Sequence, residues 1–266
     1  MPEALRNVLK NSLKEKLAQG HVVTTLSIRI FPGIEIVHIA KACGFDALYI
    51  DLQHSSLSIE STSLLSIAAL GVGIPAIVRV PTYGPEYICR VLDGGAQGVL
   101  APDVASVEDA RKIVALSKFA PQGERSTGGG LPHLGYRNWP AQETTEVMNE
   151  TTSVFVQIES STAVDHADQI AAVDGVDLLM VGTNDLCASF GIPGQHGHKL
   201  VREAYARIIA AARKHGKHVG VGGISDQKLI AEYVGMGARL VATGTDVGML
   251  MEIGSQRVKF VQSLRV

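Results

Sequence analysis

The sequence predicts a single α/β domain over residues 1–266, folded as a closed (β/α)8 TIM barrel. Three observations support this: eight short apolar runs, amphipathic helical segments between them, and a length that fits one barrel of roughly 250 residues. The runs are continuous rather than alternating, as is typical of parallel strands buried on both faces. The expected strands are residues 22–29, 47–52, 76–80, 98–102, 154–159, 178–182, 218–222 and 240–245.

The segments between these runs carry helical periodicity. A polar helical stretch precedes the first strand, and further helices are expected within residues 34–44, 58–71, 85–95, 106–119 and 201–216. A doubly wound sheet is the structural alternative, but no GxGxxG motif follows the first expected strand. Residues 121–152 form a long connection, which we expect to be either functional or an interface element, or else a surface segment that covers the barrel.

Composition excludes several classes of protein. Hydrophobic residues make up 46% of the chain, and the formal net charge is −2. This balance, without a cluster of Lys and Arg, argues against a nucleic-acid partner. No apolar run approaches the roughly 18 residues of a membrane span, and the first residues lack the pattern of a signal peptide. Three widely spaced cysteines form no CxxC pair and suit a reducing compartment, so we expect a soluble cytoplasmic protein.

Polar residues follow the apolar runs where the strands are expected to end. In a (β/α)8 barrel, the C-terminal ends of the strands carry the catalytic residues. Each of these polar residues comes after a run too apolar to be a surface strand. They are Asp51 and His54 after the second run, Arg79 after the third, Gln157 and Glu159 in the fifth, and Asp185 after the sixth.

Glu159 and Asp185 come from the ends of neighbouring strands. Two carboxylates in one place repel each other unless a positive charge lies between them. A divalent cation with oxygen ligands satisfies this need, and two protein ligands plus water and substrate oxygens suit Mg²⁺ or Mn²⁺. The alternative is that one carboxylate forms a structural ion pair with Arg79.

His54 and Asp51 lie three residues apart across a strand end. Asp51 could orient the imidazole and stabilise its charge, which would make His54 a general base near neutral pH. Arg79 carries a fixed charge and a planar set of donors that suit an oxyanion or a carboxylate. The alternatives are a surface histidine and an arginine that clamps the layers of the barrel.

The run from Gly182 through Thr183 and Asn184 to Asp185 is expected to open a short helix. Free backbone N–H groups at such a start can bind a carboxylate or a phosphate. No expected strand ends in lysine, and a Schiff-base aldolase needs a lysine in its site. The sequence therefore favours metal chemistry over imine chemistry.

Several stretches of the chain together resemble the HpcH/HpaI family of class II aldolases, over residues 32–250. They are GFDALYIDLQH, PAIVRVP, LDGGAQGVLAPDV, APQGERSTGGG, the stretch from VFVQIES to NDLCASFG, and MGARLVATGTDVGML. The resemblance implies a barrel of the phosphoenolpyruvate/pyruvate-binding type. It also implies cleavage or formation of 4-hydroxy-2-oxo acids, with pyruvate as the common fragment.

The resemblance also implies roles for particular residues. Glu159 and Asp185 become the metal ligands, His54 the acid/base assisted by Asp51, and Arg79 the residue that stabilises the pyruvate enolate. A further aspartate, Asp93, resembles one that reaches a histidine of a neighbouring subunit. Members similar in this way form hexamers from dimers that exchange a C-terminal helix. The oxygen ligands do not choose among Mg²⁺, Mn²⁺ and Co²⁺.

The sequence departs from the family pattern at a few positions. Gln53 stands where many members have glutamate. Arg29, at the end of the first strand, is not expected from the family pattern, and this residue could line the acceptor pocket. Glycine-rich VGVGGIS and ATGTD resemble the phosphate site of other barrels. Three alternatives therefore remain: an oxaloacetate decarboxylase, an acyl-CoA lyase, and a phosphate-binding barrel without aldol activity.

Overall fold

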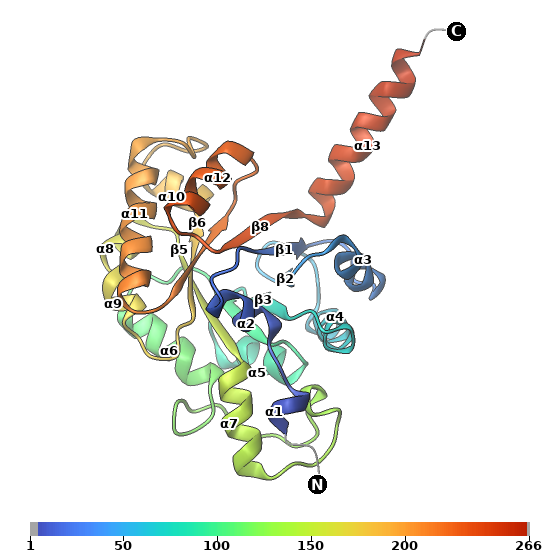
Figure 1. The fold of residues 1–266 in the computed structure, drawn as a ribbon, viewed down its shortest axis with the longest axis vertical. Coiled ribbons are helices and arrows are strands. Elements are labelled where there is room, and N and C mark those ends of the chain that lie inside the picture. The colour runs from blue at the N-terminus through green and yellow to red at the C-terminus, as the bar shows by residue number, and fades with distance from the viewer. Residues whose placement is uncertain (1–4, 265–266) are drawn as a thin grey trace.

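The computed structural model describes residues 5–264 as a closed barrel of eight parallel strands (Figure 1). Each strand pairs with its sequence neighbours, and β1 closes the ring by pairing with β8. Every predicted strand is confirmed, with bounds that differ by no more than one residue. The strands are β1 (Val23–Ile28), β2 (Ala47–Asp51), β3 (Ala76–Arg79), β4 (Gly98–Ala101), β5 (Ser153–Ile158), β6 (Leu178–Gly182), β7 (His218–Gly222) and β8 (Leu240–Thr245).

Helices cover the outside of the barrel, and local signals fix where they begin and end. Ser58 and Ser106 form capping boxes at the starts of two of them, and Gly44 and Gly73 end two in the left-handed conformation that glycine adopts without strain. The covering helices are α3 (Glu35–Cys43), α4 (Ile59–Val72), α5 (Pro85–Asp93), α6 (Val107–Ser117), α8 (Ser161–Asp165), α9 (Ala167–Ala171), α10 (Thr183–Ser189), α11 (Lys199–Lys214) and α12 (Gln227–Met236).

Two apolar layers hold the barrel together. Outward-facing strand residues such as Leu48 and Ile50 pack against the helices in the main core. Inward-facing residues such as Tyr49 and Phe155 fill the barrel interior. Helix α2 (Ser12–Ala18) contributes Leu13 and Leu17 to that interior cluster, so the cluster includes residues from before the first strand. The interior is therefore packed rather than open, and the polar groups lie at the C-terminal ends of the strands.

Residues 121–152 are not a structureless cover. They contain a short 3-10 helix η1 (Pro132–Leu134) and helix α7 (Ala141–Thr151), which packs beside α1 (Leu5–Val8) over a separate apolar cluster (Figure 1). Helix α7 ends directly before β5 begins, so the segment lies toward the N-terminal ends of the strands.

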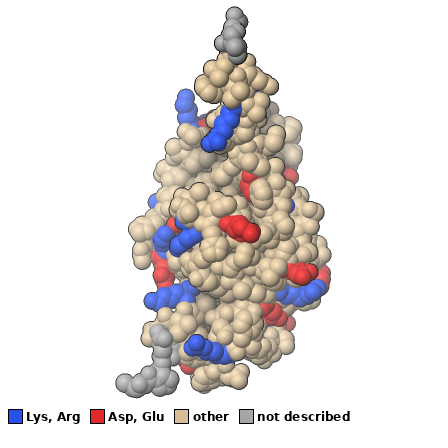
Figure 2. Space-filling view, turned by 90° about the vertical axis from the view of Figure 1, so that its right-hand side faces the viewer, with Lys and Arg blue, Asp and Glu red and all other residues tan. Residues whose placement is uncertain are grey.

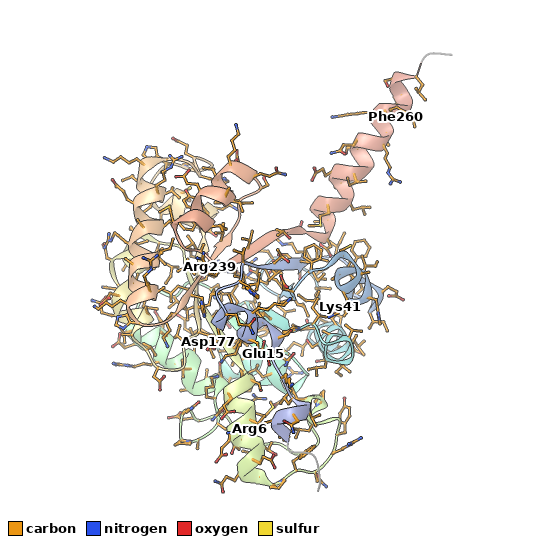
Figure 3. The ribbon with its side chains drawn as sticks, in the orientation of Figure 1. Arg6, Glu15, Lys41, Asp177, Arg239 and Phe260 are labelled. Atoms are coloured by element: carbon orange, nitrogen blue, oxygen red, sulfur yellow. The ribbon has the colours of Figure 1, made fainter. Side chains whose placement is uncertain are left out.

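The last helix, α13 (Asp246–Ser263), projects away from the barrel (Figures 1 and 3). Its exposed apolar side chains include Met251, Phe260 and Val261. Among residues 5–264, no helix is long and apolar enough to cross a membrane. On the face shown in Figure 2, basic and acidic residues are interspersed rather than gathered by sign.

Candidate active site

The polar residues at the strand ends follow from the alternation of side chains along each strand. Successive residues of a barrel strand face the interior and the helices in turn. Tyr49 and Ile77 belong to the interior cluster, so Asp51 and Arg79, two residues further on, face the same way. At the mouth, where the apolar layers end, the interior-facing series continues as Arg29, Asp51, Arg79, Gln157 and Glu159.

A cavity of about 700 Å³ opens at this mouth. It brings together most of the predicted site residues, which come from four separate strand ends or the segments after them, those of β2, β3, β5 and β6. The loop after β7 adds Gly223 and Ser225, and α13 adds Glu252. No residue of 121–152 lines this cavity, so within the described chain that segment does not shape the pocket. The predicted residues that line it are His54, Arg79, Gln157, Gly182, Thr183, Asn184 and Asp185.

Asp51 lies beneath the cavity as the centre of an ion-pair network. Its side chain is only 1% exposed. Arg79 donates to both carboxylate oxygens, from Nε to Oδ1 at 3.0 Å and from Nη2 to Oδ2 at 2.6 Å, and Arg29 donates from Nε to Oδ2 at 2.9 Å. Burial acts to raise the pKa of this carboxyl, but hydrogen bonds and charge from the arginines hold the pKa below its ordinary value.

The role of Asp51 toward His54 differs from the prediction. Oδ1 of Asp51 accepts the backbone N–H groups of Gln53 and His54, both at 3.1 Å. Among residues 5–264, no hydrogen bond joins the Asp51 carboxylate to the His54 imidazole. The physical reason is that guanidinium groups with a fixed charge occupy the oxygens of a buried carboxylate. Asp51 thus fixes the backbone at His54, and the imidazole extends exposed at the cavity.

Glu159 is a buried carboxylate in a different setting, with its residue 7% exposed. Its Oε1 accepts the backbone N–H of Asp103 at 2.7 Å, and its Oε2 accepts a short hydrogen bond from the Gln157 amide. Burial raises the pKa of Glu159; the charges of Asp103 and Asp185 add to this, while the two hydrogen bonds oppose it. No Lys or Arg forms an ion pair with Glu159 within the described chain.

These residues fit a divalent cation. Arg79 forms its ion pair with Asp51. The alternative prediction, in which Arg79 pairs with Glu159 or Asp185, is therefore wrong. A buried carboxylate without a cationic partner, near a second carboxylate, is a donor set that a hard cation satisfies. In residues 5–264 no group of three or more His, Cys, Asp or Glu is placed so that it could hold a metal ion. Two protein ligands, completed by water or substrate oxygens, match this arrangement.

Gly182, at the end of β6, is required by the closeness of this carboxylate. A Cβ atom at this position would lie 2.5 Å from Glu159 Oε2 and 2.9 Å from Gln157 Nε2. The next residue, Thr183, is fully buried, and its hydroxyl bonds the Tyr205 hydroxyl at 2.8 Å, so its side chain has a structural partner. Binding of a carboxylate by the backbone N–H groups of residues 183–185 stays a prediction.

Asp93 lies apart from the mouth cavity, at the end of α5. It accepts a hydrogen bond at 2.7 Å from Arg125, whose side chain is 1% exposed and stacks over Phe119. Asp93 itself is half-exposed. Its predicted approach to a histidine of a neighbouring subunit stays a prediction.

One important residue was missed from the sequence. Asp246, only 4% exposed, accepts the backbone N–H groups of Arg29, Ile30 and Phe31 at 2.9–3.1 Å. It therefore fixes the turn after β1 from the start of α13. The sequence signal for this residue is its place in ATGTD, directly after the last strand. The glycine of that stretch points to a phosphate site and not to a role for Asp246.

The fold and the mouth define a (β/α)8 barrel in which a buried glutamate, Glu159, and an arginine held by a carboxylate, Arg79, lie at the C-terminal ends of the strands. Residues 34–252 match the family model for HpcH/HpaI aldolase/citrate lyase, and the chain belongs to this family.

Several relatives extend the match over most of the chain. It is 39% identical over 245 residues to a 4-hydroxy-4-methyl-2-oxoglutarate aldolase of Hapsidospora irregularis, covering 91% of each chain. It is 36% identical over 245 residues to a 4-hydroxy-2-oxovalerate aldolase of Novosphingobium aromaticivorans, covering 89% of this chain and 88% of the relative. The crystal structure of an HpcH/HpaI aldolase from Desulfitobacterium hafniense superposes with a TM-score of 0.91 at 30% identity, covering 97% of this chain and 98% of that one.

Proposed function

We propose that this chain is a metal-dependent aldolase that cleaves or forms 4-hydroxy-2-oxo acids, with pyruvate as one product. One observation carries the proposal: Glu159, which is buried and has no cationic partner among the described residues, belongs to the same mouth as Arg79, which Asp51 holds in place. Membership of the family and the names of its relatives, several of which are 2-oxo acid aldolases, support the same reaction class.

Glu159 and Asp185 would hold the cation, with Mg²⁺ or Mn²⁺ as the first candidates and Co²⁺ as a third. When bound, it supplies Lewis acidity toward the 2-oxo group of the substrate. Gln157 and the backbone N–H of Asp103 keep the Glu159 carboxylate in place, because each donates to one of its oxygens. The carboxylate is thus oriented before any substrate arrives.

Cleavage needs a base at the C4 hydroxyl and stabilisation of the charge that develops on the pyruvyl fragment. His54 accepts the hydroxyl proton. The C3–C4 bond then breaks, an aldehyde or ketone leaves, and the bonding electron pair passes into the enolate of pyruvate. Arg79 lines the cavity with a fixed charge and stabilises the enolate oxygen, and a proton returned to C3 gives pyruvate.

Asp51 contributes by restricting Arg79. Two hydrogen bonds from one guanidinium to one carboxylate fix the plane of the arginine, and the pair is almost fully buried. An oxyanion site works because its donors are already oriented when charge develops. Decarboxylation of oxaloacetate gives the same enolate, so we expect it as a side activity of this site.

The relatives do not agree on the second product. Those named for methyl-oxoglutarate or glucarate act on dicarboxylic acids, and those named for oxovalerate or rhamnonate act on monocarboxylic ones. An acyl-CoA substrate is disfavoured, because its phosphates need a basic surface and the sequence has no cluster of Lys and Arg near the motifs of the site.

The chain also has a surface suited to a second copy of itself. The projecting helix α13 exposes Met251, Phe260 and Val261, and apolar side chains of this size are usually covered. This supports the homo-oligomer that the family resemblance implies, with exchange of the C-terminal helix between subunits. A cytoplasmic location is part of the same proposal.

The test is pyruvate release from a panel of 4-hydroxy-2-oxo acids by the purified chain, with and without a chelator. We expect release that stops on chelation and returns on addition of Mn²⁺ or Mg²⁺. Release that continues unchanged in chelator would contradict the metal site. No release from any acid of the panel in the presence of Mn²⁺ would contradict the aldolase assignment.

A further inference from the structure

Arg29 ends β1 with a guanidinium that is only partly occupied. Its Nε donates to Asp51 Oδ2 at 2.9 Å, its side chain is 36% exposed, and it lines the mouth cavity. Within residues 5–264, its two terminal nitrogens have no hydrogen-bond partner. Those nitrogens are the pair of parallel donors with which arginine binds a carboxylate.

The charge around Asp51 is unbalanced in favour of the cations. One buried carboxylate is bonded by two guanidinium groups, Arg79 and Arg29. Its Oδ1 also accepts the backbone N–H groups of Gln53 and His54. Asp51 therefore has hydrogen-bond donors for both oxygens without Arg29. Arg79 neutralises Asp51 by itself, and the charge of Arg29 is left facing the cavity.

The backbone that carries Arg29 is fixed from the opposite end of the chain. Asp246 accepts the N–H groups of residues 29–31, including Arg29 at 3.0 and 3.1 Å. Among residues 5–264, no ion pair joins the Asp246 carboxylate to the Arg29 guanidinium, because the carboxylate is turned toward the backbone of the turn. The other acidic residue on this side of the cavity, Glu252, forms no ion pair with Arg29 and is exposed.

The position of Arg29 around the ring suits the far end of a substrate. In the order β1 to β8, β1 stands opposite β5, which carries Glu159. His54 follows β2 and Arg79 ends β3, so the proposed base and enolate site lie on the way from β5 round to β1. A cavity of about 700 Å³ is also far larger than a three-carbon acid fills.

We propose that Arg29 binds a second carboxylate, carried by the fragment that leaves from or adds to pyruvate. The acceptor is then an oxo acid, and the full substrate is a 4-hydroxy-2-oxo dicarboxylic acid whose two carboxylates lie at opposite sides of the mouth. The identity of the pyruvyl end rests on the function proposed above, whereas the carboxylate site at Arg29 rests on the geometry of β1.

The experiment compares the binding of two inert acids of equal length, 2-oxoglutarate and 2-oxopentanoate, by calorimetry in the presence of Mn²⁺. They differ only in a terminal carboxylate against a terminal methyl group. We expect the wild-type chain to bind 2-oxoglutarate about 10- to 100-fold more tightly, the range for charge-assisted hydrogen bonds. In Arg29→Gln, the ratio of the two dissociation constants should fall to within about threefold.

The ratio separates two roles for Arg29, because a loss that acts through Asp51 and Arg79 weakens both acids equally. The matched control is Glu252→Gln, which removes an acidic group from the same cavity and should leave the ratio unchanged or raise it. A wild-type ratio near one, or a ratio that Arg29→Gln leaves intact, overturns the proposal. Neither acid undergoes cleavage, so an intact preference in a chain that releases no pyruvate would reject the aldolase and keep the carboxylate site.

Discussion

Two sides of one cavity treat a buried carboxylate in opposite ways. On the β1–β3 side, Asp51 lies between two guanidinium groups, and its pKa is held below the ordinary value. On the β5–β6 side, no Lys or Arg within residues 5–264 forms an ion pair with Glu159, and burial together with the charges of acidic neighbours raises its pKa. On the first side the buried carboxylate is neutralised within the chain, whereas on the second, among residues 5–264, no Lys or Arg side chain forms an ion pair with the carboxylate. The difference is the reason for placing the proposed cation at Glu159.

The sharpest test of this comparison removes the uncompensated carboxylate. Glu159→Gln keeps the size of the side chain, replaces one of its two acceptor oxygens by an NH2 group, and loses the charge that would bind a cation. We expect the kcat for pyruvate release to fall about 1,000-fold, because metal assistance supplies several kcal/mol of transition-state stabilisation. A coupled assay for pyruvate measures this. Activity within tenfold of wild type would remove Glu159 from the metal site.

On the compensated side, Arg79→Lys keeps the charge and loses the paired geometry. Lysine cannot donate to both oxygens of Asp51 in a fixed plane, so the enolate site loses its orientation. We expect kcat to fall about 100-fold with a smaller change in KM, as for the loss of one oxyanion donor. Steady-state kinetics on one 4-hydroxy-2-oxo acid would show it. A change confined to KM would mean that Arg79 only binds the ground state.

The two sides should also respond oppositely in stability. Asp51 has a folded-state pKa below its ordinary value, so its ionised form stabilises the fold at pH 7, and this contribution disappears as the pH falls through that pKa. Glu159 has a raised pKa, so its ionisation disfavours folding at pH 7. We therefore expect Asp51→Asn to lower the free energy of unfolding by about 2 kcal/mol, and Glu159→Gln to raise it by about 1 kcal/mol.

Urea unfolding of both variants at pH 7, with a chelator present, measures this pair. The chelator matters because a bound cation would stabilise wild type alone. Destabilisation of the chain by both substitutions would break the contrast between the two sides.

The smallest effect is expected at Gly182, which touches only the uncompensated side. The added methyl group of Gly182→Ala meets Glu159 Oε2 at 2.5 Å, so the carboxylate must shift. We expect about a tenfold rise in the Mn²⁺ concentration that gives half-maximal activity, as for changes next to metal ligands. Gly235→Ala in α12, where an added Cβ meets nothing within 4 Å, is the matched control and should leave that concentration unchanged.

Much of the fold could be predicted because parallel strands that are buried on both faces occur in the sequence as continuous apolar runs. The same runs also predicted the mouth of the barrel, because a charged residue that ends a buried strand is expected to lie where the apolar layers end. The partner of Asp51 could not be predicted in this way. Sequence spacing places it near His54, but pairing inside a barrel depends on which strands are neighbours, and β3 brings Arg79 directly beside it.

Contacts between the two ends of the chain were harder still. The register of β1 against β8 decides that Asp246 meets residues 29–31, and no local pattern carries that information. The outward course of α13 was also beyond sequence reasoning, because its apolar residues are equally compatible with a helix that covers the barrel. For residues 121–152, length suggested a loop, and the packing of α7 beside α1 shows a substructure instead.

The bonds from Asp246 to the turn after β1 have a consequence for synthesis of the chain on the ribosome. Residues 29–31 emerge early, but the carboxylate that fixes them lies 217 positions after Arg29. Contacts so distant in sequence form late, after local helices and strand pairs. The turn that carries Arg29 therefore lacks these particular hydrogen bonds until nearly the whole polypeptide has left the exit tunnel. A nascent chain interrupted before Asp246 would lack this restraint, even with most of its strands already made.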